Sequence, residues 1–226
     1  MKPIARIHTD FPEKFGIPRQ SGKVPELRGR IIFEPPYRNP DAVRELTEYD
    51  WLWLIWGFSL VPENRTFTPT VRPPRLGGNK RVGVFATRSP FRPNPLGLSS
   101  VRIEEVKLSG SEGPEIIVSG IDMLSGTPIY DIKPYLPYAD AHPEARGGFA
   151  ADHLKHRLEV VCPPEMTCDL TRVQLEGLMG VLAEDPRPAY QQDPERVYGL
   201  SYAGKNITFK VEENVLTVTA VTAIDN

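Results

Sequence analysis

The 226-residue sequence has no long apolar run. No stretch approaches the ~20 consecutive apolar residues that a membrane-spanning helix requires. Residues 1–16 also lack the extended apolar core of a secretory signal peptide. We therefore expect a cytoplasmic protein without membrane contacts.

Cysteine is scarce, since the chain carries only Cys162 and Cys168. Two cysteines are too few for a disulfide framework. With His153 and His156 they give the spacing H-x2-H-x5-C-x5-C, which offers four zinc ligands but matches no common zinc motif. Residues 154–162 also alternate like a β-strand, which sends neighbouring side chains to opposite faces. We therefore expect ordinary structural residues and no metal site.

Several widespread motifs are missing. The sequence contains no G-x-G-x-x-G and no G-x-x-x-x-G-K-[ST] loop, so the usual dinucleotide and nucleoside triphosphate folds lack support. It contains neither H-E-x-x-H nor G-x-S-x-G, the signatures of zinc proteases and α/β-hydrolases. These enzyme classes are therefore not indicated.

Acidic residues are absent from one continuous segment. Between Asn64 and Ile103 there is no Asp or Glu, so the segment carries +8 although the whole chain carries −2. Its positive residues are Arg65, Arg72, Arg75, Lys80, Arg81, Arg88, Arg92 and Arg102. Such a segment suits a surface for phosphate or carboxylate groups. A merely solvated basic face is the alternative.

Proline and glycine are abundant, with 24 and 18 residues, and helix interiors tolerate neither well. Together with short apolar runs they favour a mainly β architecture with many turns. The apolar run 51–61, which holds three tryptophans, predicts a buried central strand. Residues 39–49 predict a helix that Asn39 caps and that has Pro40 at its first position.

The composition changes near residues 139–153, which indicates a linker. Beyond it, residues 169–185 predict a helix with Asp169 as its N-cap. Residues 196–224 predict three strands, with turns at Gly204–Lys205 and Glu213–Asn214. We therefore predict two units, a β-rich domain at 1–145 and a small α+β domain at 146–226.

The stretch GVFATRSPFRPNPLGLSS, residues 83–100, is both stiff and positive. Its three prolines, Pro90, Pro93 and Pro95, each fix φ and restrict the preceding residue. A loop set in advance loses little entropy when a ligand binds. A stiff barrel loop without any partner explains the same pattern equally well.

Four blocks of the sequence resemble the TrmO family of YaeB-like tRNA methyltransferases. They are EKFGIPRQSG (13–22), TVRPPRLGGNKRVGVFATRSPFRPNPLGLSS (70–100), SGTPIYDIKPYLPYAD (125–140) and AEDPRPAY (183–190). The resemblance implies a single-sheeted antiparallel β-barrel that binds S-adenosylmethionine. It also implies N6-methylation of threonylcarbamoyladenosine next to the anticodon of tRNA, and a homodimer.

The resemblance also assigns residues around the cofactor. The PRQ-containing turn begins at Pro18 and Arg19, and Ser125 stands where many members have Asp. Ser59 and Leu60 stand where the family has His-Gln, so two polar side-chain contacts to the cofactor differ here. The positions expected to border the cofactor are Gln20, Ser21, Gly22, Ser59, Leu60, Arg88, Leu98, Gly126, Thr127, Pro128 and Ile129.

Methyl transfer from a sulfonium is an in-line displacement, so the protein mainly supplies alignment and electrostatics. The acceptor nitrogen is a poor nucleophile, so a nearby base would help. Asp131 near Lys133 is our candidate, with a turn or barrel-rim ion pair as the alternative. Arg88 is expected to orient a carboxylate. The residues expected to contact the tRNA anticodon stem-loop are Arg72, Arg75, Lys80, Arg81, Arg92 and Tyr135, with Tyr138 a further candidate for base stacking.

Two other functions remain open from the residues alone. One is a non-catalytic RNA- or nucleotide-binding barrel, which the departures at Ser59, Leu60 and Ser125 favour. The other is methylation of a different acceptor.

Overall fold

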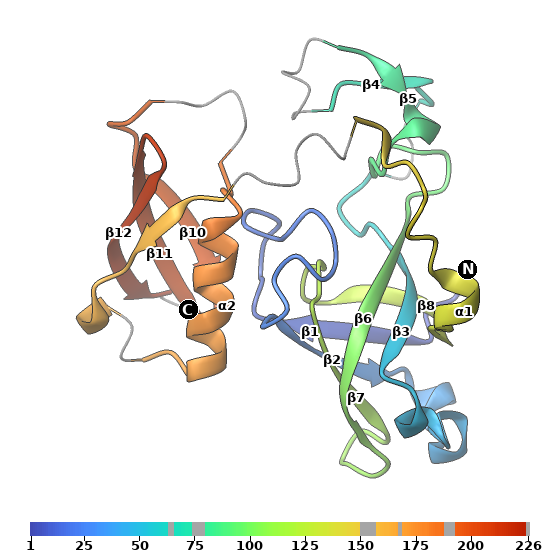
Figure 1. Cartoon of the computed structure of the whole chain (residues 1–226). Coiled ribbons are helices and arrows are strands. Elements are labelled where there is room, and N and C mark those ends of the chain that lie inside the picture. Colours follow the sequence, from blue (N-terminus) through green and yellow to red (C-terminus); the bar gives the residue numbers. More distant parts are fainter. Residues whose placement is uncertain (63–65, 74–79, 150–156, 167–168, 188–192, 225–226) are drawn as a thin grey trace.

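The computed structural model describes residues 1–62, 66–73, 80–149, 157–166, 169–187 and 193–224. Its larger part is a closed six-stranded antiparallel barrel in the order β1-β2-β7-β6-β3-β8 (Figure 1). The strands are β1 (Ala5–Thr9), β2 (Arg28–Phe33), β3 (Trp51–Gly57), β6 (Leu96–Lys107), β7 (Glu115–Ser119) and β8 (Thr127–Pro134). The predicted mainly β fold with an N-terminal antiparallel barrel is therefore confirmed.

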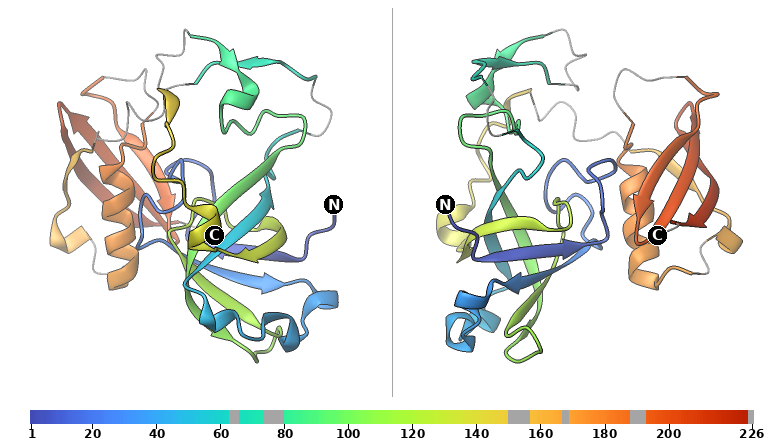
Figure 2. Two further views of the ribbon diagram at one scale, coloured as in Figure 1. Left: turned by 45° about the vertical axis from the view of Figure 1, so that its right-hand side comes forward. Right: turned by 180° about the vertical axis from the view of Figure 1, so that it is seen from behind.

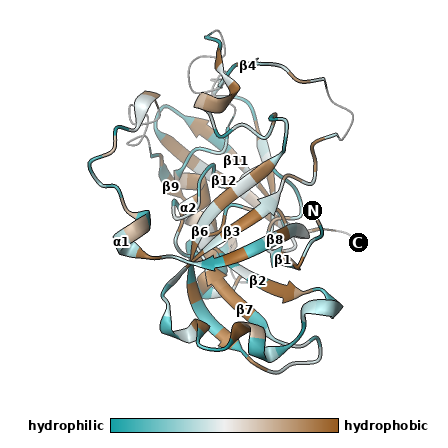
Figure 3. Cartoon of the chain, turned by 90° about the vertical axis from the view of Figure 1, so that its right-hand side faces the viewer, coloured by the Kyte–Doolittle hydropathy of each residue, from teal (hydrophilic) through white to brown (hydrophobic). Residues whose placement is uncertain are grey.

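The Trp-rich segment forms β3, which pairs with β6 on one side and with β8 on the other. Leu52, Leu54 and Trp56 face the barrel interior, whereas Trp51 is 39% exposed. The same alternation is visible as hydropathy along the barrel strands (Figure 3). The strand is central, as predicted, but only alternate side chains are buried because a barrel wall has an outer face.

Antiparallel pairing brings several segments to one end of the barrel. Leu96 pairs with Gly57, and Ile129 pairs with Trp56. The carboxyl end of β3 therefore lies beside the amino ends of β6 and β8, at the upper end in Figure 1. We call this end the barrel mouth.

A projection stands above the mouth (Figure 2). It holds the two-stranded ribbon β4 (Thr70–Val71) and β5 (Val82–Gly83) and the 3-10 helix η5 (Val84–Ala86). The loop from Thr87 to Pro95 then leads directly into β6. The projection is thus built from the segment without acidic residues.

The helix predicted at 39–49 is wrong. Two 3-10 helices lie there instead, η2 (Pro40–Val43) and η3 (Leu46–Glu48), and Glu45 between them has a φ of 63°. The Asn39 side chain does cap η2 by accepting from the Asp41 N–H at 3.0 Å. In η2 and η3 only Val43 is buried, so the segment has no apolar face to stabilise a longer helix.

The remaining short helices are η1 (Pro35–Tyr37), α1 (Pro137–Asp140) and η7 (Pro164–Met166). In the part of the chain that the structure describes, no helix is long and apolar enough to cross a membrane.

The C-terminal part is a four-stranded sheet in the order β10-β11-β12-β9, with one helix on it. The strands are β9 (Glu159–Val161), β10 (Tyr198–Tyr202), β11 (Lys205–Glu212) and β12 (Val215–Ala223), and the helix is α2 (Arg172–Ala183). The three predicted strands and the turn at Glu213–Asn214 are confirmed, whereas the first turn lies at Ala203–Gly204, one residue before the predicted position, because Lys205 already belongs to β11. The predicted N-cap is wrong: Thr171 caps α2 in a capping box with Gln174, and Asp169 instead pairs with Lys205 at 2.9 Å.

The barrel and the C-terminal part share one hydrophobic core. Helix α2 lies on the side of its sheet that faces the barrel (Figures 1 and 2). Phe11 contacts Tyr202 with ring centroids 5.2 Å apart, and the Asp10 carboxylate accepts from Gln174 at 3.3 Å. Burial raises the pKa of the Asp10 carboxyl group. The interface is therefore packed and partly polar, and the boundary at residues 145/146 stays a prediction.

Candidate active site

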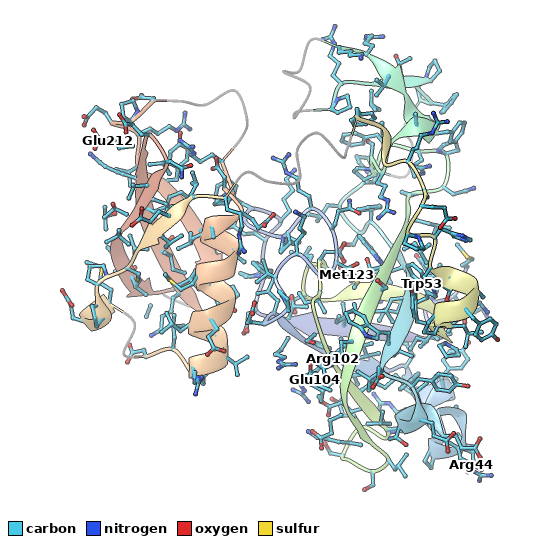
Figure 4. All side chains as sticks on the ribbon, viewed as in Figure 1. Arg44, Trp53, Arg102, Glu104, Met123 and Glu212 are labelled. Atoms are coloured by element: carbon cyan, nitrogen blue, oxygen red, sulfur yellow. The ribbon has the colours of Figure 1, made fainter. Side chains whose placement is uncertain are left out.

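A carboxylate that the sequence analysis did not single out lies at the barrel mouth. Asp122 follows β7 and precedes Met123, which is buried and labelled in Figure 4. The Ser99 hydroxyl donates to the Asp122 carboxylate at 2.7 Å, and the Trp56 indole N–H donates to the Ser99 oxygen at 3.0 Å. The result is a hydrogen-bonded chain from the barrel interior to the mouth.

The surroundings of Asp122 change its protonation. Burial raises the pKa of its carboxyl group from 3.8 to about 6. The hydrogen bond from Ser99, the N–H groups of Ser21 and Asp122, and the charge of Arg88 lower that pKa and so limit the rise. A carboxyl group with a pKa near neutrality suits proton transfer at physiological pH.

The turn at residues 18–22 connects to this carboxylate. The Ser21 N–H donates to Asp122, and the Gly22 N–H donates to the Gly120 carbonyl at 2.8 Å. The Arg88 guanidinium donates to the Gln20 side-chain oxygen. The structure thus brings together Gln20, Ser21 and Arg88, which the sequence analysis placed at the cofactor.

The proline-rich loop is held by its own hydrogen bonds. The Thr87 oxygen accepts from the Ser89 N–H at 3.2 Å, and the Ser89 oxygen accepts from the Phe91 N–H at 3.2 Å. The Arg92 guanidinium donates to the Thr87 carbonyl at 2.8 Å and lies 5.8 Å from the Phe85 ring centroid. Arg92 therefore ties the loop together, and its predicted contact with tRNA stays a prediction.

The predicted catalytic pair lies on the outer face of the barrel. Asp131 and Lys133 form an ion pair at 3.0 Å, with both side chains substantially exposed. Asp131 pairs across β3 with Ile55, which pairs in turn with Leu98 of β6. Two strand spacings, about 10 Å, therefore separate the backbones of Asp131 and Leu98. Leu98 is 56% exposed and offers an apolar surface there.

The other predicted cofactor residues lie around the mouth. Ser59 and Leu60 are exposed directly after β3. Thr127 is 2% exposed and Ile129 is fully buried inside the barrel. The Gly126 N–H donates to the Ile7 carbonyl at 2.8 Å.

The side chains of Thr127 and Ile129 are buried and do not reach the surface. Contacts to a ligand here are therefore limited to the backbone of these two residues, to Gly126 and to the partly buried Pro128. Ser125, the departure from the family pattern, has a structural role here. Its hydroxyl accepts from the Thr9 N–H at 3.2 Å.

The predicted tRNA-binding residues are distributed over the projection and the segment from Tyr135 to Asp140 that follows β8. Arg72, Lys80 and Arg81 are exposed on or beside the ribbon, and Arg81 donates to the Thr70 hydroxyl at 3.2 Å. Arg75 lies outside the described residues. Tyr135 packs on Trp53 with centroids 5.6 Å apart, whereas Tyr138 is 86% exposed.

Aromatic side chains are exposed on the same projection. Phe67, Phe85 and Phe91 are 52%, 71% and 46% exposed, and the Phe67 and Phe85 rings stack with centroids 6.4 Å apart. A cavity of about 260 Å³ lies beside them, lined by Thr68, Phe67, Phe91, Arg92, Pro93 and Pro95 among others. Exposed aromatic rings beside basic side chains are typical of surfaces that stack nucleobases.

Among the described residues, no group of three or more His, Cys, Asp and Glu side chains could hold a metal ion. Three members of the weighed zinc pattern, His153, His156 and Cys168, lie outside the described residues. Burial, and then the charge of Glu165, raise the pKa of the Cys162 thiol.

Known proteins resemble this chain along its whole length. It matches the sequence models of the tRNA-methyltransferase O N-terminal domain over residues 6–141 and of the TrmO C-terminal domain over residues 155–224. It is 38% identical over 218 residues to the Escherichia coli (strain K12) tRNA (adenine(37)-N6)-methyltransferase, covering 93% of this chain and 92% of that protein.

Two further relatives come from Pseudomonas aeruginosa. The putative S-adenosylmethionine-dependent methyltransferase RcsF is 40% identical over 216 residues, with 88% of this chain and 87% of that protein covered. The crystal structure of TrmO superposes with a TM-score of 0.77 at 32% identity and covers 98% of this chain and 97% of that chain.

The barrel fold, the groups at the barrel mouth and the similarity to known tRNA methyltransferases together define a tRNA methyltransferase built on a β-barrel. The likeness to both domain models covers most of the chain, in the order that the family has them. The chain belongs to the TrmO family.

Proposed function

We propose that this protein transfers a methyl group from S-adenosylmethionine to N6 of threonylcarbamoyladenosine beside the anticodon of tRNA, in the cytoplasm and as a homodimer. The observation that carries the proposal is the match to both TrmO domains in one chain. The name of the Escherichia coli relative supports adenine 37 as the modified base. The Arg88 guanidinium can bind one carboxylate in a bidentate way, and the threonyl carboxylate of the substrate and the carboxylate of the cofactor are the two alternatives.

The residues at the mouth fit the cofactor. Its carboxylate suits the Arg88 guanidinium, its amino group suits the polar atoms of Gln20 and Ser21, and its apolar parts suit exposed Leu60 and Leu98. Gly22 has a φ of +76°, and a side chain there would meet open space, so the turn leaves room for a ligand. When bound, the cofactor supplies an electrophilic methyl group on a positive sulfur. Asp131 and Lys133 are retained as candidate contacts to the acceptor.

Binding and product analysis test the proposal separately. The purified protein is expected to bind S-adenosylmethionine in calorimetry without added metal. Tandem mass spectrometry of tRNA nucleosides from cells lacking the protein is expected to show threonylcarbamoyladenosine in place of its N6-methyl form. Unchanged nucleosides in those cells would rule out the proposed substrate, and binding without any methylation would favour the non-catalytic barrel.

The exposed aromatic residues of the projection supply the proposed tRNA surface. Replacing Phe67 and Phe91 together with alanine is expected to weaken tRNA binding by about 30-fold or more, since stacking contributes ~1–3 kcal/mol per base. Filter binding at several salt concentrations measures the effect, and cofactor affinity should stay within twofold. Tyr37→Ala, an exposed aromatic in η1, is the matched control. Equal tRNA affinities of the Phe67/Phe91 double variant and the Tyr37→Ala control would contradict a role for this surface in tRNA binding.

A further inference from the structure

Asp122 is a largely buried carboxylate at the barrel mouth to which the residues predicted for the cofactor and the acceptor give no role. Asp122 is partly exposed at the mouth, and its carboxylate also accepts a hydrogen bond from Ser99, which connects it to the barrel interior. Its carboxylate accepts hydrogen bonds from three places, namely the Ser99 hydroxyl of β6, the Ser21 N–H of the turn and its own backbone N–H. The charged group whose field acts on it is Arg88 of the loop.

We propose that Asp122, rather than Asp131, is the proton acceptor for the nitrogen that is methylated. The assignment rests on the proposed function. In the transfer step, the N6 proton moves to an Asp122 carboxylate oxygen while the N6 electron pair forms the bond to the methyl carbon. The methyl–sulfur bond breaks with both electrons remaining on sulfur. A carboxylate and a sulfonium are thereby converted into a carboxylic acid and a neutral thioether, so all atoms and charges balance.

The environment of Asp122 favours this step. The reaction cancels one negative and one positive charge, and a site with little water stabilises separated charges poorly. The burial that disfavours the ionised form of Asp122 therefore lowers the barrier for its protonation. The Ser99 hydroxyl and Ser21 N–H hold the carboxylate in one orientation, which a proton acceptor requires.

Asp131 is the weaker candidate on geometry. One of its oxygens accepts from the Ile132 N–H at 3.0 Å, and the other pairs with Lys133 at 3.0 Å. Both oxygens of Asp131 are thus already engaged by neighbours on its own strand, and its side chain lies on the outer face of the barrel. Asp122 has a hydroxyl and an N–H group as partners instead, and its pKa of about 6 lies close to neutrality.

The experiment is a pH profile of single-turnover methylation, measured for the wild type, Asp122→Asn and Asp131→Asn with threonylcarbamoyladenosine-bearing tRNA. The wild-type rate is expected to rise tenfold per pH unit below about pH 6 and to level above it. Asp122→Asn should lose this limb and about 100-fold or more of the plateau rate. Asp41→Asn, an exposed carboxylate paired with Arg44 at the other end of the barrel, should behave as the wild type.

A second readout needs no bound cofactor. A carboxyl group with a raised pKa in the folded state stabilises the protein at low pH, and this stabilisation is lost as the pH rises through the folded pKa. The unfolding temperature of the wild type, relative to that of Asp122→Asn, should therefore decrease as the pH is raised from about 4 to about 6. Ser99→Ala removes a hydrogen bond that lowers the pKa of Asp122, so it should move the rate limb to higher pH.

The outcomes separate the two levels of the proposal. No methylation by the wild type would reject the proposed function. A wild-type profile that is flat from pH 5 to pH 8, an active Asp122→Asn enzyme with an unchanged limb, or loss of the limb in Asp131→Asn would reject Asp122 while keeping the function. If Asp122→Asn does not fold, Ser99→Ala decides, and a limb that stays in place rejects the assignment.

Discussion

Replacing Arg88 with alanine is expected to slow methyl transfer by about 100- to 1,000-fold, the range found when a preorganised charged or hydrogen-bonding group is removed from an active site. Arg88 donates to Gln20 and acts electrostatically on Asp122. Its loss therefore releases the turn at residues 18–22 and raises the pKa of the Asp122 carboxyl group. The side chain is exposed, so the unfolding temperature should change little. Single-turnover rates set beside thermal melts measure both effects.

Two further variants sharpen this experiment. Arg88→Lys keeps the charge but not the planar fork of donors, so it should recover only part of the lost rate. Arg44→Ala removes an arginine of comparable exposure at the lower end of the barrel, far from the projection (Figure 4), and should leave the rate unchanged. An Arg88→Ala enzyme within threefold of the wild-type rate would exclude a role for this guanidinium in transfer.

The second large effect is expected from Gly97→Ala in β6. A Cβ at position 97 would lie 2.2 Å from the Trp56 indole, and that ring is nearly buried and packs on Phe58 with centroids 4.4 Å apart. Because the indole cannot move without disturbing the barrel, the substitution should destabilise the fold by about 1–3 kcal/mol. It should also break the Trp56–Ser99 hydrogen bond and slow methylation even at temperatures where the protein is folded.

Gly83→Ala is the matched control for this prediction. Gly83 lies in β5, and a Cβ there would meet nothing within 4 Å. Chemical denaturation curves at one pH compare the two variants. Equal stability of Gly97→Ala and Gly83→Ala would mean that the indole position is adaptable and that the close approach in β6 has no energetic consequence.

The strands were predictable because their signals are local. The apolar run of β3 and the turns near 204 and at 213–214 are encoded within a few residues. The error at 39–49 has the same origin, since Asn39 and Pro40 are correct start signals. Whether a helix continues beyond its first turn depends on an apolar face that packs against another part of the protein. The eleven residues 39–49 do not reveal whether such a packing partner exists.

The site was predictable only in part. The resemblance named Gln20, Ser21 and Arg88, which the structure places close to one another, and their role at the cofactor stays a prediction. Ser99 and Asp122 were not singled out from the sequence. Asp122 stands alone as an acid in the apolar run after β7, and an isolated carboxylate at the end of a buried strand is a usable signal. Its partner Ser99 is 23 residues away in the sequence. Only the barrel register reveals that pairing.

The shared core gives the C-terminal part an influence on events at the mouth. Helix α2 contacts the segment that follows the turn at residues 18–22: a side chain at Gly180 would meet Val24, and one at Gly177 would meet Leu27. Lys23 also pairs with Glu184 at 3.5 Å. The turn at residues 20–22 is thus supported from outside the barrel, by the contacts that the segment after it makes with α2 and Glu184. Selection for faster or slower methylation can therefore act on α2, a helix that contains none of the proposed catalytic groups.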